Sequence, residues 1–200
     1  MSKQKILDAA FESFSKGHYN SVSISEISQK AGIKKPSIYA HFDSKESLFL
    51  QVFEDKSSKI YSKFLNLINE NRGCDTKVIL ENILIESINY IRENKPIGGF
   101  LAYLFFVTSY DLPEKIIDRI EKFKNLMNYL ITETIENGIN KEELTKEEVD
   151  AIIYFYYCLL QGNIQMELNS DIFNMDKVNK SWNYFWESVR NKFYGTQIKA

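Results

Sequence analysis

The sequence predicts an all-α protein, and three observations lead to this fold class. Its 200 residues include only three prolines and eight glycines, so few positions interrupt regular structure. Apolar residues recur at the three- and four-residue spacing of amphipathic helices. Stretches that alternate apolar and polar residues, as half-buried strands do, are almost absent. We expect about nine helices, at 3–16, 24–31, 36–42, 45–71, 76–94, 99–108, 114–137, 146–168 and 176–194.

Turn-forming residues separate the predicted helices. The segment 95–99 contains Pro96 and two glycines, and we expect it to stay outside a helix because proline lacks a donor and glycine is flexible. Breaks of the same kind are predicted at 72–75, 111–113, 138–145 and 169–175. The fourth helix runs on without a break from the N-terminal region into the rest of the chain.

Two short helices around a glycine are predicted near residue 30. Ser23 and Glu26 are three apart, as in a capping box, so the first helix begins near Ile24. Gly32 can adopt a positive φ at little cost and provides the turn. Pro36 suits the first position of the second helix, which we place at 36–41.

The second short helix has one apolar face and one polar face. Ile38 and Phe42 are four apart and would plug into the small core. Lys34 and Lys35 cannot accept hydrogen bonds from the first amides of this helix, which therefore stay available to a phosphate. The remaining surface is formed by Lys35, Ser37, Tyr39, Ala40 and His41.

The next helix begins with a second predicted capping box, formed by Asp43 and Glu46. Lys45 lies in its first turn, where the helix dipole disfavours a cation. A phosphate outside the protein would explain this lysine, and we prefer that interpretation to a merely solvated side chain.

The run from Ile27 to Leu48 resembles the DNA-binding domain of the TetR family of bacterial transcriptional repressors. The resemblance is carried by Ala-Gly-Ile at 31–33, Ser-Ile-Tyr-Ala-His-Phe at 37–42 and Ser-Lys-Glu-Ser-Leu at 44–48, at the family's spacing without gaps. The preceding helix, with Phe11, Phe14 and Gly17, is also similar. Ser28 departs from the family's usual alanine, and Pro36 replaces a more flexible residue.

The resemblance implies a helix-turn-helix domain at 1–47, the reader domain, and a larger helical domain at 48–200 for effector binding and dimerisation. It implies a repressor that a small molecule releases from a near-palindromic DNA operator. It also implies phosphate contacts from Ser23, Tyr39, His41 and Lys45, and groove contacts from Lys34, Lys35, Ser37 and Ala40.

The N-terminal part of the chain carries a small excess of positive charge, as DNA binding requires. The net charge is −2, but residues 1–47 hold seven lysines against five acids, which leaves −4 for the remainder. A protein that coats DNA without specificity would be far more basic. A few placed cations on a specific operator fit this balance better.

Several classes of protein are disfavoured by the sequence. Cys74 and Cys158 have no metal-ligand spacing, so we predict no metal, no cofactor and no disulfide framework. Both histidines, His18 and His41, precede residue 48, so the larger domain lacks the commonest general base and we predict no enzyme. Without a signal region or an apolar run of about 20 residues, a cytoplasmic location and no membrane contact are expected.

Aromatic and amide side chains of the larger domain form our candidate effector site. Apolar walls with a few hydrogen-bonding groups are typical of small-molecule sites, although for each residue by itself core packing is the better explanation. An apolar or aromatic effector, neutral or weakly cationic, would suit such walls. The candidates are Phe100, Tyr103, Phe106, Tyr110, Met127, Tyr154, Tyr157 and Gln161.

The segments 146–168 and 176–194 are predicted to form a homodimer interface, because both carry apolar residues on more than one side. Two copies would place two recognition helices in successive major grooves, about one turn of DNA or more apart. An alternative remains open: a helical adaptor that binds a protein through its aromatic face and whose reader domain is non-functional.

Overall fold

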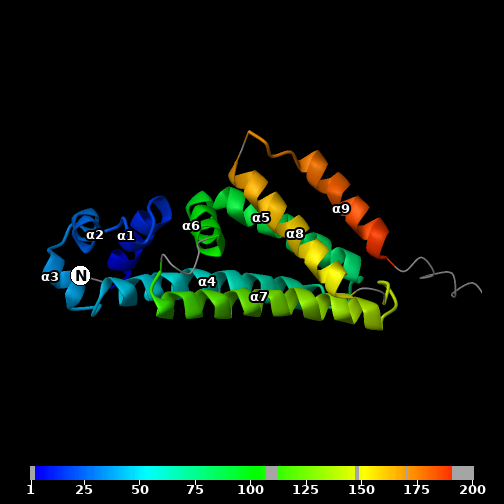
Figure 1. The fold of residues 1–200 in the computed structure, drawn as a ribbon, viewed down its shortest axis with the longest axis horizontal. Coiled ribbons are helices and arrows are strands. Elements are labelled where there is room, and N and C mark those ends of the chain that lie inside the picture. The colour runs from blue at the N-terminus through cyan, green and yellow to red at the C-terminus, as the bar shows by residue number, and fades with distance from the viewer. Residues whose placement is uncertain (1–2, 107–111, 147–148, 170, 191–200) are drawn as a thin grey trace, which may run out of the picture. The chain divides into compact units, whose positions relative to one another are not determined.

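The computed structural model describes residues 3–106, 112–146, 149–169 and 171–190. Within these ranges the chain forms nine α-helices, which Figure 1 shows in chain order. None of the described helices combines the length and the hydropathy that crossing a membrane requires. The helices are α1 (Lys3–Lys16), α2 (Ile24–Ala31), α3 (Lys35–Tyr39), α4 (Lys45–Glu70), α5 (Thr76–Glu93), α6 (Lys95–Phe106), α7 (Glu114–Asn140), α8 (Val149–Leu168) and α9 (Met175–Val189).

The chain divides into two compact units. The first comprises Met1–Ser62 and Asn94–Asn125, and the second comprises Lys63–Glu93 and Leu126–Ala200. The unit that contains the predicted reader domain is therefore larger than residues 1–47, because α6 and the first part of α7 belong to it. The predicted boundary between a DNA-binding domain at 1–47 and an effector domain at 48–200 concerns function, and it stays a prediction.

Aromatic rings form the core of the first unit. Phe14 of α1 meets Phe49 of α4 edge to face, with ring centroids 4.9 Å apart, and Phe49 lies 5.7 Å from Phe100 of α6. All three rings are buried. Burial of each side chain contributes about 1.5–3 kcal/mol, so these rings hold α1, α4 and α6 together.

The second unit packs α5, α8 and α9 around another aromatic cluster. Tyr156 of α8 is fully buried, and its hydroxyl donates to the carbonyl of Leu80 in α5 at 2.7 Å. Trp182 and Phe185 of α9 stack at 5.6 Å beside it. The apolar stripe predicted on the last helix is thus core: Val178, Trp182, Phe185, Trp186 and Val189 are all buried.

Most predicted helices agree with the structure to within a few residues, but the predicted break at 95–99 is wrong. The α6 helix begins at Lys95, because the Asn94 carbonyl accepts the amides of Ile97 at 2.9 Å and Gly98 at 3.1 Å. Pro96 lies in the first turn, where a missing amide hydrogen costs nothing. The two glycines follow inside the helix.

Candidate DNA interface

The first reader helix, α2, begins and ends as predicted. Ser23 has extended backbone angles, and its hydroxyl accepts the Glu26 amide at 3.1 Å. Gly32 adopts φ 67° and ψ 37° in the left-handed region. The amide of Ile33 then returns to the Ser28 carbonyl at 2.9 Å, which closes the helix end and turns the chain toward α3.

The second reader helix, α3, begins one residue earlier than predicted. Lys34 is its N-cap and makes no side-chain capping bond, so Pro36 occupies the second helical position rather than the first. Ile38 is completely buried and fixes the helix on the core. No side chain caps α3, but Pro36 has no amide hydrogen and the Ser37 amide donates to the Lys34 carbonyl at 2.9 Å, so fewer amides stay available to a phosphate than expected.

The predicted DNA-contacting residues are exposed in the structure, with Lys45 as the exception. Tyr39, for example, is 47% exposed although it is aromatic. An exposed hydroxyl and cations around a buried isoleucine can meet the groove and its phosphates. The exposed members are Ser23, Lys34, Lys35, Ser37, Tyr39, Ala40 and His41.

The capping box predicted from Asp43 and Glu46 is wrong by one residue. The Ser47 amide donates to the Ser44 hydroxyl at 3.0 Å, and the Ser44 amide donates to the Ser47 hydroxyl at 3.1 Å. Two serines therefore cap α4 reciprocally. The Ser47 hydroxyl, at the third helical position, reaches back to the cap as a glutamate would. The prediction failed because it looked for an acid at that position of the capping box.

Lys45 is held inside the protein. Its ammonium donates to the carbonyls of Tyr19 at 2.9 Å and Val22 at 3.2 Å, and lies 4.3 Å from the centroid of the Tyr19 ring. Partial burial lowers the pKa of Lys45 below its usual value. Its contact with phosphate stays a prediction; the two carbonyls take two of the three N–H donors of the ammonium and leave one.

Two further side chains of α2 are satisfied within the first unit. The buried Ser28 hydroxyl donates to the Ser25 carbonyl at 2.8 Å, so the replacement of the family's alanine leaves no orphaned group. Lys30 pairs with Glu12 of α1 at 3.3 Å. Lys30 therefore ties α2 to α1.

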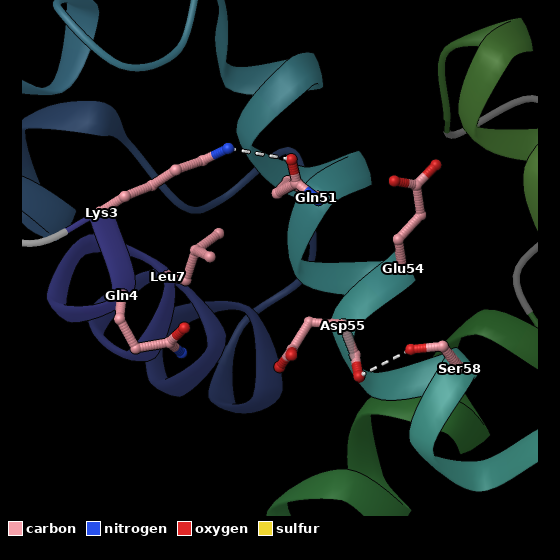
Figure 2. Close-up of a pocket in the computed structure, with 7 residues that line it drawn as sticks. All are labelled: Lys3, Gln4, Leu7, Gln51, Glu54, Asp55 and Ser58. Carbon is pink, nitrogen blue, oxygen red and sulfur yellow. Dashed lines mark hydrogen bonds between the residues drawn. The ribbon is translucent and has the colours of Figure 1, made fainter. Parts of the chain in front are cut away.

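A groove of about 380 Å³ lies between α1 and α4 in the first unit. Figure 2 shows Lys3 reaching from α1 toward Gln51 of α4, where its ammonium donates at 3.1 Å. The ammonium also lies 5.3 Å from the Phe42 ring centroid, just after α3. The groove is polar, so it lacks the apolar walls predicted for an effector; its lining is Lys3, Gln4, Leu7, Gln51, Glu54, Asp55 and Ser58.

The acids of this groove already have partners. Asp55 pairs with Lys56 at 3.0 Å and with Lys59 at 2.8 Å, and Glu54 pairs with Arg119 at 3.3 Å. Among the residues that the structure describes, no cluster of three potential ligands could hold a metal ion. We assign no ligand to the groove.

The predicted effector-site residues fall in both units. Phe100 packs in the core of the first unit, and Tyr103 accepts a hydrogen bond from the Tyr19 amide at 3.3 Å. In the second unit Met127, Tyr157 and Gln161 are half-buried and Tyr154 is 71% exposed. The Phe106 side chain and Tyr110 lie outside the described residues. A ligand contact stays a prediction for all eight.

Sequence reasoning missed the contribution of the segment between α1 and α2. Tyr19 and Val22 act through backbone carbonyls, for which side-chain identity carries no signal. Lys3 was also missed, although its position at the start of an amphipathic helix with no acid in the first turn was visible. The Ser44 and Ser47 spacing was the signal for the true cap of α4.

The geometry defines a helix-turn-helix DNA-binding protein with a second helical unit. The family profile described as "Bacterial regulatory proteins, tetR family" matches residues 6–52. The Bacillus subtilis fatty acid metabolism regulator protein is 23% identical over 140 residues, which cover 70% of this chain and 71% of that protein. IcaR of Staphylococcus aureus, the negative transcriptional regulator of the biofilm operon icaADBC, is 28% identical over 160 residues, covering 77% and 79%.

Solved structures share the fold. The transcriptional regulator FadR from Bacillus subtilis, in complex with stearoyl-CoA, matches with a TM-score of 0.74 over 93% of this chain and 96% of that chain, at 18% identity. Residues 6–52 match the DNA-binding domain of the TetR family, and the chain is a DNA-binding transcriptional regulator. Its relatives are regulators, in agreement with the prediction that it is not an enzyme.

Proposed function

We propose that this regulator is a repressor that binds a near-palindromic operator as a homodimer and is released by an apolar acyl effector. The observation that carries the proposal is the exposed surface of α3 around the buried Ile38. Lys34 and Lys35 are exposed at the start of this helix, and Tyr39 and His41, also exposed, follow. Phosphate contacts would position the helix and groove contacts would select sequence.

Comparison with relatives supports the direction of control and the effector class. IcaR is named a negative regulator, and the FadR structure contains stearoyl-CoA. A long acyl chain agrees with the apolar effector expected from the aromatic sequence of the larger domain. In the second unit, Met127, Tyr157 and Gln161 are half-buried, as residues that line a ligand site often are.

An uncharged face of α8 supports dimerisation. Six exposed residues at three- and four-residue spacing form one stripe along this helix and carry no charge; the exposed Asp150, four residues before Tyr154, lies at its N-terminal end. A contiguous apolar surface of this kind marks an interaction site, and a second copy of the chain would cover it isologously. The stripe comprises Ala151, Tyr154, Phe155, Cys158, Gly162 and Met166.

Fluorescence anisotropy with labelled DNA from upstream of the protein's own gene tests operator binding. We expect tight binding of two subunits per site that a scrambled competitor does not displace. Replacing Tyr39 by Phe should weaken binding to all sequences, whereas replacing Lys35 or Ser37 by Ala should change the preferred operator. Equal affinity of wild type and variants for operator and scrambled DNA would refute the proposal.

Adding stearoyl-CoA to the protein–operator complex tests the effector class. Release of the DNA supports the acyl proposal. The matched control is free coenzyme A, which lacks the acyl chain. Release by free coenzyme A alone would show that the acyl chain is not what the protein recognises. Persistent operator binding at saturating stearoyl-CoA would reject this effector while leaving the repressor intact.

Sedimentation velocity tests the dimer. Replacing Tyr154 by Glu should produce monomers, because a carboxylate on the stripe would be buried without a partner. Replacing Tyr129 by Glu is the control, since this tyrosine of α7 is also exposed, at 60%, and lies outside the stripe. A dimer with no DNA affinity would instead support the adaptor alternative.

A further inference from the structure

Tyr19, between α1 and α2, is held from two sides within the first unit. Its amide donates to the hydroxyl of Tyr103 in α6 at 3.3 Å. Its carbonyl accepts from the Lys45 ammonium of α4 at 2.9 Å, and its ring lies 4.3 Å from that ammonium. One residue therefore links α6 to the first turn of α4.

The surroundings make this link firm. Tyr19 is 6% exposed, and its ring lies 6.2 Å from Phe14 and 5.2 Å from Phe49. The Tyr103 ring in turn lies 4.6 Å from the ring of His18. A charged donor in a partly buried place makes stronger hydrogen bonds than a neutral donor in water.

The same ammonium reaches the start of the first reader helix. Lys45 also donates to the carbonyl of Val22 at 3.2 Å, and Val22 precedes Ser23, the N-cap of α2. Because α2 packs on α3, the place where α2 begins sets the place of the exposed surface on α3. A displacement at Tyr19 is thereby passed to the residues proposed to meet DNA.

We infer that Tyr103 and Lys45 are positioning residues for operator binding, which clamp Tyr19 and Val22 and so couple α6 to the reader helices. This inference rests on the proposed function, since operator affinity is its output. Lys45 then acts on the protein backbone through two of its three N–H donors. Tyr103 acts through a hydroxyl, so the loss of a single oxygen atom tests its part.

A double-mutant cycle on the full chain separates coupling from simple loss of stability. Tyr103→Phe should weaken operator binding about two- to tenfold, the range expected for one hydrogen bond. In a Lys45→Met background the same substitution should change the affinity by less than about 1.5-fold, because the clamp is already open. Tyr129→Phe, which removes an exposed hydroxyl in the second unit, is the control.

Amide hydrogen exchange supplies a readout that does not need DNA. Tyr103→Phe and Lys45→Met should each accelerate exchange at Tyr19, by about the same factor as the affinity changes. Ser87→Ala, which removes a buried hydroxyl bonded to the Ile83 carbonyl of α5, is the stability control and should leave Tyr19 unchanged.

The outcomes are distinguishable. Additive effects of the two substitutions on operator affinity, or unchanged exchange at Tyr19 in both variants, would overturn the inference. A wild-type protein without operator affinity would refute the proposed function instead. Exchange at Tyr19 would then decide alone whether the clamp exists.

Discussion

The salt dependence of operator binding should depend on Lys34 and Lys35 and not on Lys45. Both residues at the start of α3 are exposed, whereas the Lys45 ammonium is bonded to two carbonyls. Only a cation that neutralises a phosphate releases condensed counterions from DNA. We therefore consider Lys35→Ala and Lys45→Met, which remove the same formal charge from positions ten residues apart.

The magnitude follows from the number of phosphates released. A lysine that enters the groove can also neutralise a neighbouring phosphate, and each neutralised phosphate contributes about 0.9 to the slope of log affinity against log salt. Loss of one such phosphate in each subunit through Lys35→Ala should lower the slope by about 1.8. Over a fourfold rise in salt, this variant should lose about 12-fold less affinity than the wild type. Lys45→Met should weaken binding yet leave the slope unchanged.

Anisotropy titrations at four salt concentrations measure the slope. Lys122→Ala, at an exposed position of α7, controls for the change in net charge. A slope lowered as much by Lys45→Met as by Lys35→Ala would mean that Lys45 also neutralises a phosphate, and the prediction that its carbonyl bonds keep it out of the salt dependence would be refuted.

Three further predictions concern stability. Gly32→Ala should cost about 1–2 kcal/mol in urea unfolding and Gly32→Asn less, because φ is 67° while a Cβ there would meet nothing within 4 Å. Arg92→Met should cost about 2–4 kcal/mol, because Glu167, 5% exposed, would lose its guanidinium partner at 3.1 Å. Burial raises the pKa of Tyr156 well above its ordinary value, so the unfolded chain loses this proton first, and stability should fall by up to about 1.4 kcal/mol per unit as pH rises above about 10.

Each of these predictions has a result that contradicts it. A loss above about 3 kcal/mol for Gly32→Ala would indicate a steric clash that the open space excludes. Arg92→Met together with Glu167→Gln should recover most of the loss, and a double variant as unstable as Arg92→Met would show that charge pairing is not the cause. If Tyr156→Phe leaves the decline of stability above pH 10 as steep as in the wild type, Tyr156 is not its source.

Local signals were sufficient to predict most of the helices and the exposed surface of α3. Gly32, the Ser23 cap and the four-residue spacing of Ile38 and Phe42 each act within one or two turns of chain, where sequence spacing determines geometry. The predicted break at 95–99 was wrong because Pro96 was interpreted as a helix breaker. In the structure the Asn94 carbonyl accepts the first amide hydrogen bonds of α6, which places Pro96 in the first turn.

Contacts between distant segments were beyond sequence reasoning. Lys45 was interpreted from its place on α4 alone, but its partners are backbone carbonyls more than 20 residues earlier. Phe100 and Tyr103 share an aromatic composition with the rest of the candidate effector site, yet α6 packs on α1 in the first unit. Composition identifies which rings need burial and leaves open which helix buries them.

If dimers form through the stripe on α8, the proposed repression depends on the concentration of the protein. Below its dissociation constant a dimer forms with the square of protomer concentration, so its supply falls faster than synthesis does. Occupancy of a gene's control region would then follow a threshold rather than a gradual saturation. A cell could open the controlled gene by modest dilution during growth, even before any small molecule arrives.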